Sequence, residues 1–98
     1  MQQHPGIVFR DGPAGRRPGL AGGPDVWEVI RVFAGVSGSA DPLGQTIELT
    51  GLAPEAVRAA VRYYAEYRAE ILRWIERVDE AAALAEKAWR QEQELLSS

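Results

Sequence analysis

The chain has 98 residues, no cysteine and a single histidine, His4, so it is long enough for one domain but holds no disulfide, thiol nucleophile or zinc–thiolate site. Its formal net charge of −3 argues against binding to nucleic acid through bulk charge. No nucleophile is paired with a base, so we expect no enzyme, cofactor or metal site. The chain shows no signal-peptide pattern and no apolar run of the ~20 residues that a membrane span needs, so we expect a cytoplasmic protein that does not enter membranes.

The first predicted segment, residues 1–25, is rich in glycine and proline. The β-prone run "GIVFRD" (Gly6–Asp11) leads into a turn signal, "GPAG", and the chain returns through "RRPGLAGG". Pro18 and Gly19 weaken the returning strand. The pattern therefore predicts a small β-hairpin or, as the alternative, an unstructured arm.

Residues 26–67 are predicted to form a helical core. Asp25 can cap a helix from Val26 to about Ala34, whose apolar residues recur at helical spacing on one face. These residues are Val26, Val29, Ile30 and Phe33. The loop-like composition of residues 35–42 precedes a short second helix, Leu43 to Thr50, with Ile47 pointing inward.

The stretch from Ile47 to Val61 fits a helix-turn-helix motif. Gly51 supplies the tight turn, Leu52 fills it, and Pro54 stands at a first-turn position of the third helix, where its missing N–H costs nothing. We expect this helix to bury Val57, Val61 and Tyr64. The residues left on its open face are Glu55, Arg58, Ala59 and Arg62.

Arginine is the side chain best suited to guanine edges and phosphates, so this open face is a candidate DNA-binding surface. Short crossings of two helices also occur in purely structural bundles, and an exposed arginine is by default only solvated. The third helix therefore either reads DNA or is structural. We treat Arg68, Arg73 and Arg77 as solvated.

Residues 68–98 contain no proline or glycine and are predicted to form one long helix to about Leu95, after a break near residues 67–69. Apolar residues recur along it at heptad-like spacing, and together they form an apolar surface wide enough to bind a partner. The candidate contacts with a partner protein or a second copy are Trp74, Ile75, Val78, Leu84, Trp89 and Leu95.

Charge is unevenly distributed along the chain. Residues 1–31 carry four arginines against three carboxylates, a net +1, whereas residues 32–67 and 68–98 each carry a net −2. Any surface that faces phosphate should therefore draw on the front of the chain, where Arg16 and Arg17 are further candidates for DNA contact.

Three segments resemble domain-of-unknown-function family 433, whose members look like VapB-type antitoxins. The segments are "HPGIVFRDG" (His4–Gly12), "RPGLAGGPDVWEVIRVF" (Arg17–Phe33) and "LTGLAPEAVRAAVRYYAEYRAEILRWI" (Leu49–Ile75). The usual Gly-Thr-Arg step before the first helix is replaced here by Gly22-Gly23-Pro24, so a basic contact at that place is not expected.

The resemblance implies an antitoxin of a type II toxin–antitoxin system, which neutralises a PIN-like ribonuclease toxin and represses its own operator. With the patterns above it predicts a mainly α-helical protein with a homeodomain-like helix-turn-helix core, an N-terminal hairpin or arm and a long C-terminal helix. Because a chain of this size builds only a modest core, we expect it to form a homodimer. The alternatives are a stand-alone transcription regulator, whose C-terminal helix only dimerises, and an interaction module that does not bind DNA.

Overall fold

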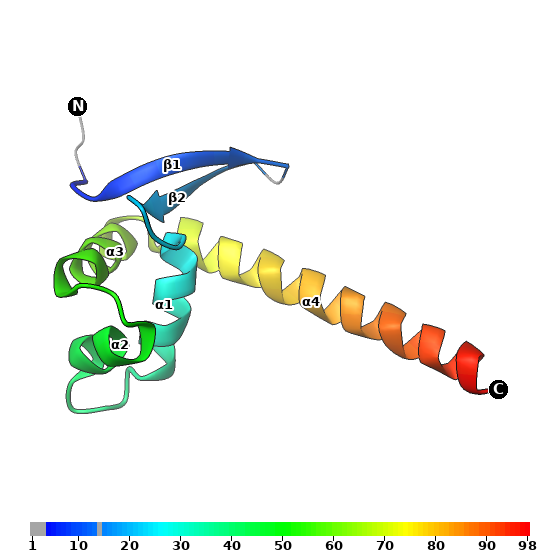
Figure 1. Cartoon of the computed structure of the whole chain (residues 1–98). Coiled ribbons are helices and arrows are strands. Elements are labelled where there is room, and N and C mark those ends of the chain that lie inside the picture. The colour runs from blue at the N-terminus through cyan, green and yellow to red at the C-terminus, as the bar shows by residue number, and fades with distance from the viewer. Residues whose placement is uncertain (1–3, 14) are drawn as a thin grey trace.

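The computed structural model describes residues 4–13 and 15–98, and it is mainly helical. The chain order is β1 (Ile7–Gly12), β2 (Gly15–Leu20), α1 (Val26–Gly35), α2 (Pro42–Thr50), α3 (Pro54–Glu66) and α4 (Arg68–Ser97). The hairpin lies over α3 and the beginning of α4, α1 runs through the middle of the body, and most of α4 projects away from it (Figure 1).

The two strands form an antiparallel hairpin, in which Ile7 pairs with Leu20 and Gly12 with Gly15. The hairpin alternative predicted from residues 1–25 is therefore confirmed. The chain leaves β2 through a tight turn in which Gly22 has a φ of +69°, and the Leu20 N–H donates to the Pro24 carbonyl at 2.8 Å. This turn brings Asp25 to the start of α1.

Local signals set the ends of α2 and α3. The Asp41 side chain accepts from the Gly44 N–H at 3.0 Å, and Pro42 occupies the first position of α2. Gly51 ends the helix at a φ of +70°, where its N–H donates to the Ile47 carbonyl at 2.9 Å. Three residues later Pro54 begins α3, so the predicted helix–glycine turn–helix sequence is present.

The break between α3 and α4 falls at Tyr67, within the predicted interval. Tyr67 leaves helical geometry, with φ −121° and ψ 48°, but its N–H still donates to the Tyr63 carbonyl at 2.9 Å. The Ile71 N–H in turn donates to the Tyr67 carbonyl at 3.2 Å. The chain therefore changes direction while its backbone hydrogen bonds continue.

The core lies where α1, α3, the first turn of α4 and the end of the hairpin meet. Its buried hydrophobic residues are Leu20, Val26, Val29, Ile30, Val57, Ala59, Ala60, Tyr63 and Ile71. In α2 the most buried residue is Thr46, whose hydroxyl donates to the Pro42 carbonyl at 2.8 Å, while Ile47 packs against the edge of the core.

The predicted buried face of α3 is wrong in part. Val57 is buried as expected, but Val61 and Tyr64 are only half-buried, and Tyr63 takes the interior position instead. The reason is that α3 is covered on two sides: by α1 and α2 on one, and by the hairpin on the other. A helix between two layers buries a wider and rotated set of residues.

Candidate functional site

The open face of α3 presents two of the predicted arginines. Arg58 and Arg62 are exposed, and the Arg58 guanidinium lies 2.9 Å from a carboxylate oxygen of Glu55, one turn earlier. Arg62 lies at the rim of two depressions, one beside Phe33 and Leu43 and the other against the start of β1. Arg62 is therefore the arginine of α3 that has no ion pair among the described residues.

Ala59 does not belong to this open face, and its prediction as a DNA contact is corrected. Only 5% of it is exposed, and Gly6 lies so close that a β-carbon placed there would sit 3.4 Å from the Ala59 methyl group. The chain entering β1 covers Ala59. A side chain buried under the hairpin has no surface to offer to a base.

Arg17, also predicted to contact DNA, instead binds Asp25 within the protein. Its Nε donates to Asp25 at 2.5 Å, and Arg10 donates to the other carboxylate oxygen of Asp25 at 2.8 Å. Arg10 donates further to the carbonyls of Leu20 and Gly23, at 2.6 and 2.7 Å. These bonds tie both strands to the start of α1, so Arg17 has a structural role in this arrangement.

Asp25 stands immediately before α1, as predicted. Its carboxylate accepts hydrogen bonds from Arg10 and Arg17, and the Trp27 indole N–H donates to it at 3.3 Å. The Glu28 carboxylate accepts from the Asp25 N–H at 2.9 Å, which is the returning half of a capping box. The helix start and the hairpin are therefore fixed by one nearly buried carboxylate.

Arg16 points to the other side of the hairpin and reaches α4. Its Cζ lies 4.3 Å from the centre of the Phe9 ring, and it lines a depression together with Trp74. Arg73 and Arg77 of α4 line the same depression. Sequence placed Arg16 in the DNA-binding set and Trp74 in the partner-binding set, but the fold brings them together.

An aromatic cluster joins the hairpin to the α3–α4 break. The Tyr63 hydroxyl donates to Glu70 at 2.6 Å, and the Tyr63 ring meets His4 and Phe9 edge-on, with centroids 5.1 and 6.3 Å apart. Burial raises the pKa of Tyr63 above its usual value, and the hydrogen bond to Glu70 and the Glu70 charge raise it further. The phenol therefore stays protonated and serves as a hydrogen-bond donor.

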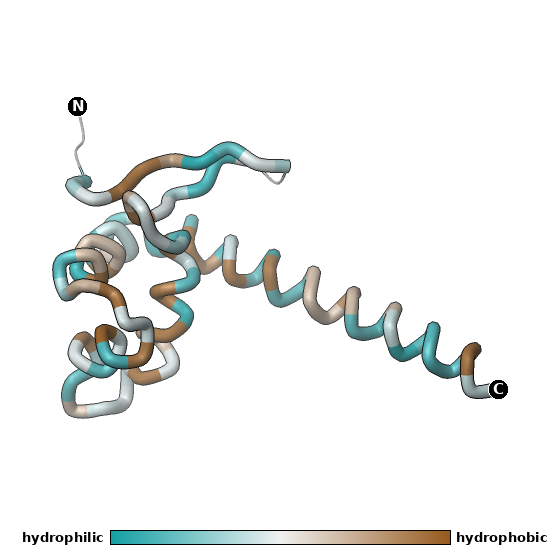
Figure 2. Tube along the Cα trace, in the orientation of Figure 1, coloured by the Kyte–Doolittle hydropathy of each residue, from teal (hydrophilic) through white to brown (hydrophobic). Residues whose placement is uncertain are grey.

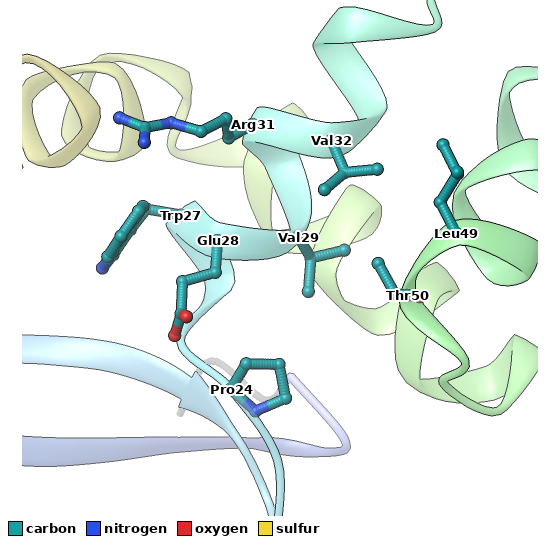
Figure 3. Close-up of a pocket in the computed structure, with 8 residues that line it drawn as sticks. All are labelled: Pro24, Trp27, Glu28, Val29, Arg31, Val32, Leu49 and Thr50. Atoms are coloured by element: carbon teal, nitrogen blue, oxygen red, sulfur yellow. The ribbon is translucent and has the colours of Figure 1, made fainter. Parts of the chain in front are cut away.

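A hollow of about 430 Å³ is lined by residues of α1 and α2 and by Pro24 (Figure 3). Val29 and Val32 point into it from α1 toward Leu49 and Thr50 of α2, while Trp27 and Arg31 stand beside each other at the far side. The Arg31 guanidinium carbon lies 5.3 Å from the Trp27 ring centre, and Arg31 also pairs with Asp79 of α4. The hollow is mostly apolar and offers few polar groups.

The predicted partner-binding residues of α4 fall into two groups. Ile75 packs against the core, and Trp74 and Val78 are half-buried beside it. Leu84, Trp89 and Leu95 are 68%, 59% and 77% exposed, and every residue from 81 to 98 is exposed. The first group belongs to the body of the protein, and only the second is free to meet a partner.

The hydropathy pattern along the free part of α4 is interrupted (Figure 2). Apolar turns alternate with hydrophilic ones, and a hydrophobic turn stands near the C-terminus. Among the described residues, no helix combines the length and the apolar character needed to cross a membrane.

Sequence reasoning missed the convergence of Arg16, Arg73 and Arg77, and the pairing of Arg10 and Arg17 with Asp25. The spacing of Arg73 and Arg77, four residues apart on a predicted helix, was the one available signal of a shared face. Nothing in the pattern indicated that the hairpin would lie against that face.

No protein-family model, curated protein sequence or solved structure matches this chain. Its function has to be inferred from its own surfaces, of which the free segment of α4 and the exposed arginines are the most distinctive.

Proposed function

We propose that this protein is a non-enzymatic antitoxin that covers a PIN-like ribonuclease toxin with the free segment of α4 and binds its own operator through α3. The observation that carries the proposal is the exposure of Leu84, Trp89 and Leu95 on a helix that extends beyond the body. Large apolar side chains in such a position favour insertion into the groove of a partner. Aromatic residues such as Trp89 commonly dominate the binding energy of such interfaces.

The length of α4 supports this role. Thirty residues span about 45 Å at the rise of an α-helix, and its contacts with the body lie between Arg68 and Asp79. From Glu80 onward the helix carries four glutamates and two basic residues, with apolar groups between them. An acidic, apolar-faced helix suits a partner whose groove is basic at its rim, as expected of a nuclease that binds RNA.

The DNA-binding part of the proposal treats α2 and α3 as a homeodomain-like helix-turn-helix. It is supported by the three-residue connection from Gly51 to Ala53 and by the exposure of Arg58 and Arg62 on α3. Arg62 is free of carboxylates among the described residues, and Arg58 can exchange its exposed pair with Glu55 for a phosphate.

One observation favours the alternative of a stand-alone regulator whose α4 only dimerises. Five alanines follow one another closely between residues 81 and 88, and small residues let two helices approach closely. In this alternative Leu84 and Trp89 meet their own copies across a two-fold axis.

Deletion of residues 79–98 tests the antitoxin proposal. The truncated protein should no longer neutralise the toxin encoded beside it, measured as protection of RNA from cleavage, and should retain part of its operator binding. Full neutralisation by the truncated form would rule out this role of α4 and leave dimerisation.

For α3, the double variant Arg58→Ala/Arg62→Ala should weaken operator binding in a gel-shift assay, and unchanged binding would reject α3 as the recognition helix.

A further inference from the structure

The arginines of this protein divide into those that are neutralised and those that are not. Five of them lie within 4 Å of a carboxylate; these are Arg10, Arg17, Arg31, Arg58 and Arg90. Arg16, Arg73 and Arg77 form no ion pair within residues 4–13 and 15–98, and all three line one depression of about 390 Å³. Three unpaired cations therefore share one place on a protein that is acidic as a whole.

Aromatic rings hold two of these arginines in position. The Arg16 Cζ lies 4.3 Å from the centre of the Phe9 ring, and the Arg77 Cζ lies 5.0 Å from that of Trp74. A ring face attracts a guanidinium without cancelling its charge, so the N–H groups remain available to an anion. Less side-chain entropy is then lost when an anion binds.

The positions of the arginines leave an electrostatic cost that an anion would relieve. Arg73 and Arg77 lie one turn apart on α4, where like charges disfavour the helix. Arg16 approaches the same depression from β2. Cations from two elements facing one space repel each other unless a negative group stands between them.

One carboxylate, Glu70, lines the depression as well, and it already accepts the Tyr63 hydroxyl at 2.6 Å. Glu70 forms no ion pair with any of the three arginines, so the lining carries three positive charges and one negative. The remaining lining residues, Ala69 and Trp74, are apolar. A local charge of +2 thus stands beside an apolar wall.

We propose that this depression binds a backbone phosphate of a nucleic-acid strand, held by Arg16, Arg73 and Arg77, with Trp74 against the adjoining sugar or base. Guanidinium groups donate in a planar fork that matches phosphate oxygens. Three forks arriving from two elements suit a tetrahedral group better than a flat carboxylate, and the indole offers the kind of surface on which nucleotides pack. An acidic polypeptide is the competing ligand that the experiment has to separate.

The inference deepens the proposed operator binding, because it adds a contact that α3 does not supply, but it stands on different residues. It also moves Trp74 from the partner-binding set to a nucleic-acid site. If both contacts act on one duplex, operator affinity depends on both sets of arginines.

The test measures binding of the full chain to labelled duplex DNA and to a labelled single strand, by fluorescence anisotropy at several salt concentrations. The variant Arg16→Ala/Arg73→Ala/Arg77→Ala should weaken binding about tenfold or more and, because one phosphate contact is lost, reduce the salt slope by about 1. The matched control, Arg90→Ala, removes an exposed arginine from the free part of α4 and should change neither quantity. Alanine suits the exposed helical positions, and circular dichroism checks that the triple variant folds.

Two comparisons separate this inference from the α3 proposal. If the triple variant loses affinity while Arg58→Ala/Arg62→Ala does not, the phosphate site stands and the α3 assignment fails. If only the α3 variant loses affinity, or if the triple variant keeps the affinity and salt slope of the wild type, the phosphate site is wrong.

A third comparison identifies the ligand. Poly-glutamate and inorganic phosphate are titrated into the wild type and the triple variant at constant ionic strength, with the Trp74 indole N–H followed by NMR and assigned with Trp74→Phe. A shift of this signal with phosphate in the wild type alone supports the site. Tight binding of poly-glutamate that depends on the three arginines, with none of either nucleic acid, would overturn it.

Discussion

At the scale of single residues, Asp25 is the side chain on which the attachment of the hairpin depends. It is 8% exposed and accepts from Arg10 and Arg17, which come from opposite strands. Hydrogen bonds to charged groups contribute more to stability than neutral ones, and removing one partner leaves buried donors unsatisfied. The sequence suggested Asp25 as a helix cap, but its role as an acceptor for two arginines depends on the hairpin register.

The substitution Asp25→Asn tests this role. It keeps the shape but loses the charge and turns an amide NH₂ toward an arginine, so we expect the free energy of unfolding to fall by about 1–3 kcal/mol. The control is Asp79→Asn, which removes a more exposed pair with Arg31 and should cost less than about 0.5 kcal/mol. Urea unfolding measures both, and equal effects would show that the Asp25 cluster is no more important than a surface pair.

Ionisation of the Tyr63 phenol makes the free energy of unfolding depend on pH in the alkaline range. Its pKa is raised, first by burial and then by Glu70, so folding favours the protonated phenol. The stabilisation is complete below pH ~10, the usual tyrosine value, and is lost as the pH rises toward the folded-state pKa. Tyr63→Phe cannot lose a proton, so the stability difference between wild type and variant should shrink or reverse between pH 8 and pH 11.

Urea unfolding at these two pH values measures that difference. Tyr67, whose pKa is also raised, is present in both proteins, so its own titration contributes to both. A difference that stays constant with pH would mean that the Tyr63 phenol is not held protonated by the fold.

At the scale of elements, much of this fold follows from signals in the sequence. Asp25, Gly51 and Pro54 mark helix ends where the structure has them, and the absence of proline and glycine after residue 67 predicts the long helix. The buried face of α3 could not be predicted in full. Periodicity from Val57 selects Tyr64, whereas the hairpin packed on the other side draws Ala59 and Tyr63 inward.

The candidate site was less predictable than the elements. Arg58 and Arg62 lie on an exposed helix face that spacing alone identifies. Arg16 and Arg73 are 57 positions apart, and their meeting depends on how the hairpin crosses α4, which no local pattern records. Local sequence signals predict single helices and strands, whereas a site shared by two of them can be identified only from the tertiary structure.

The turn between α2 and α3 provides a test at this scale. Gly51 has a φ of +70°, and a side chain in this region costs about 1 kcal/mol. We therefore expect Gly51→Ala to lower the free energy of unfolding by about that amount, although nothing lies within 4 Å of an added β-carbon. Gly35→Ala at the end of α1, where φ is not positive and space is open, should be neutral or slightly stabilising.

Thermal and urea unfolding compare the two glycine variants. If Gly51→Ala is as stable as Gly35→Ala, the connection between α2 and α3 does not depend on the left-handed conformation.

At the scale of the whole molecule, the protein consists of a small body and a projecting helix, with overall extents of 56 × 34 × 23 Å. The body supplies the exposed arginines of α3 and the depression beside Arg16, and the free part of α4 supplies the apolar groups. This division suits a protein that holds nucleic acid and a protein partner at separate places. It also means that changes in the free part of α4 should leave the body folded.

The most direct test of the central proposal is co-expression with the product of the adjacent gene, followed by co-purification on a tag placed on this chain. We predict a stable complex with a small ribonuclease, which is lost in Leu84→Ala/Trp89→Ala and retained in the control Glu86→Ala/Arg90→Ala, an exposed pair on another face of the same helix. A neighbouring product that is not a nuclease, or a complex that survives the loss of Leu84 and Trp89, would contradict the account.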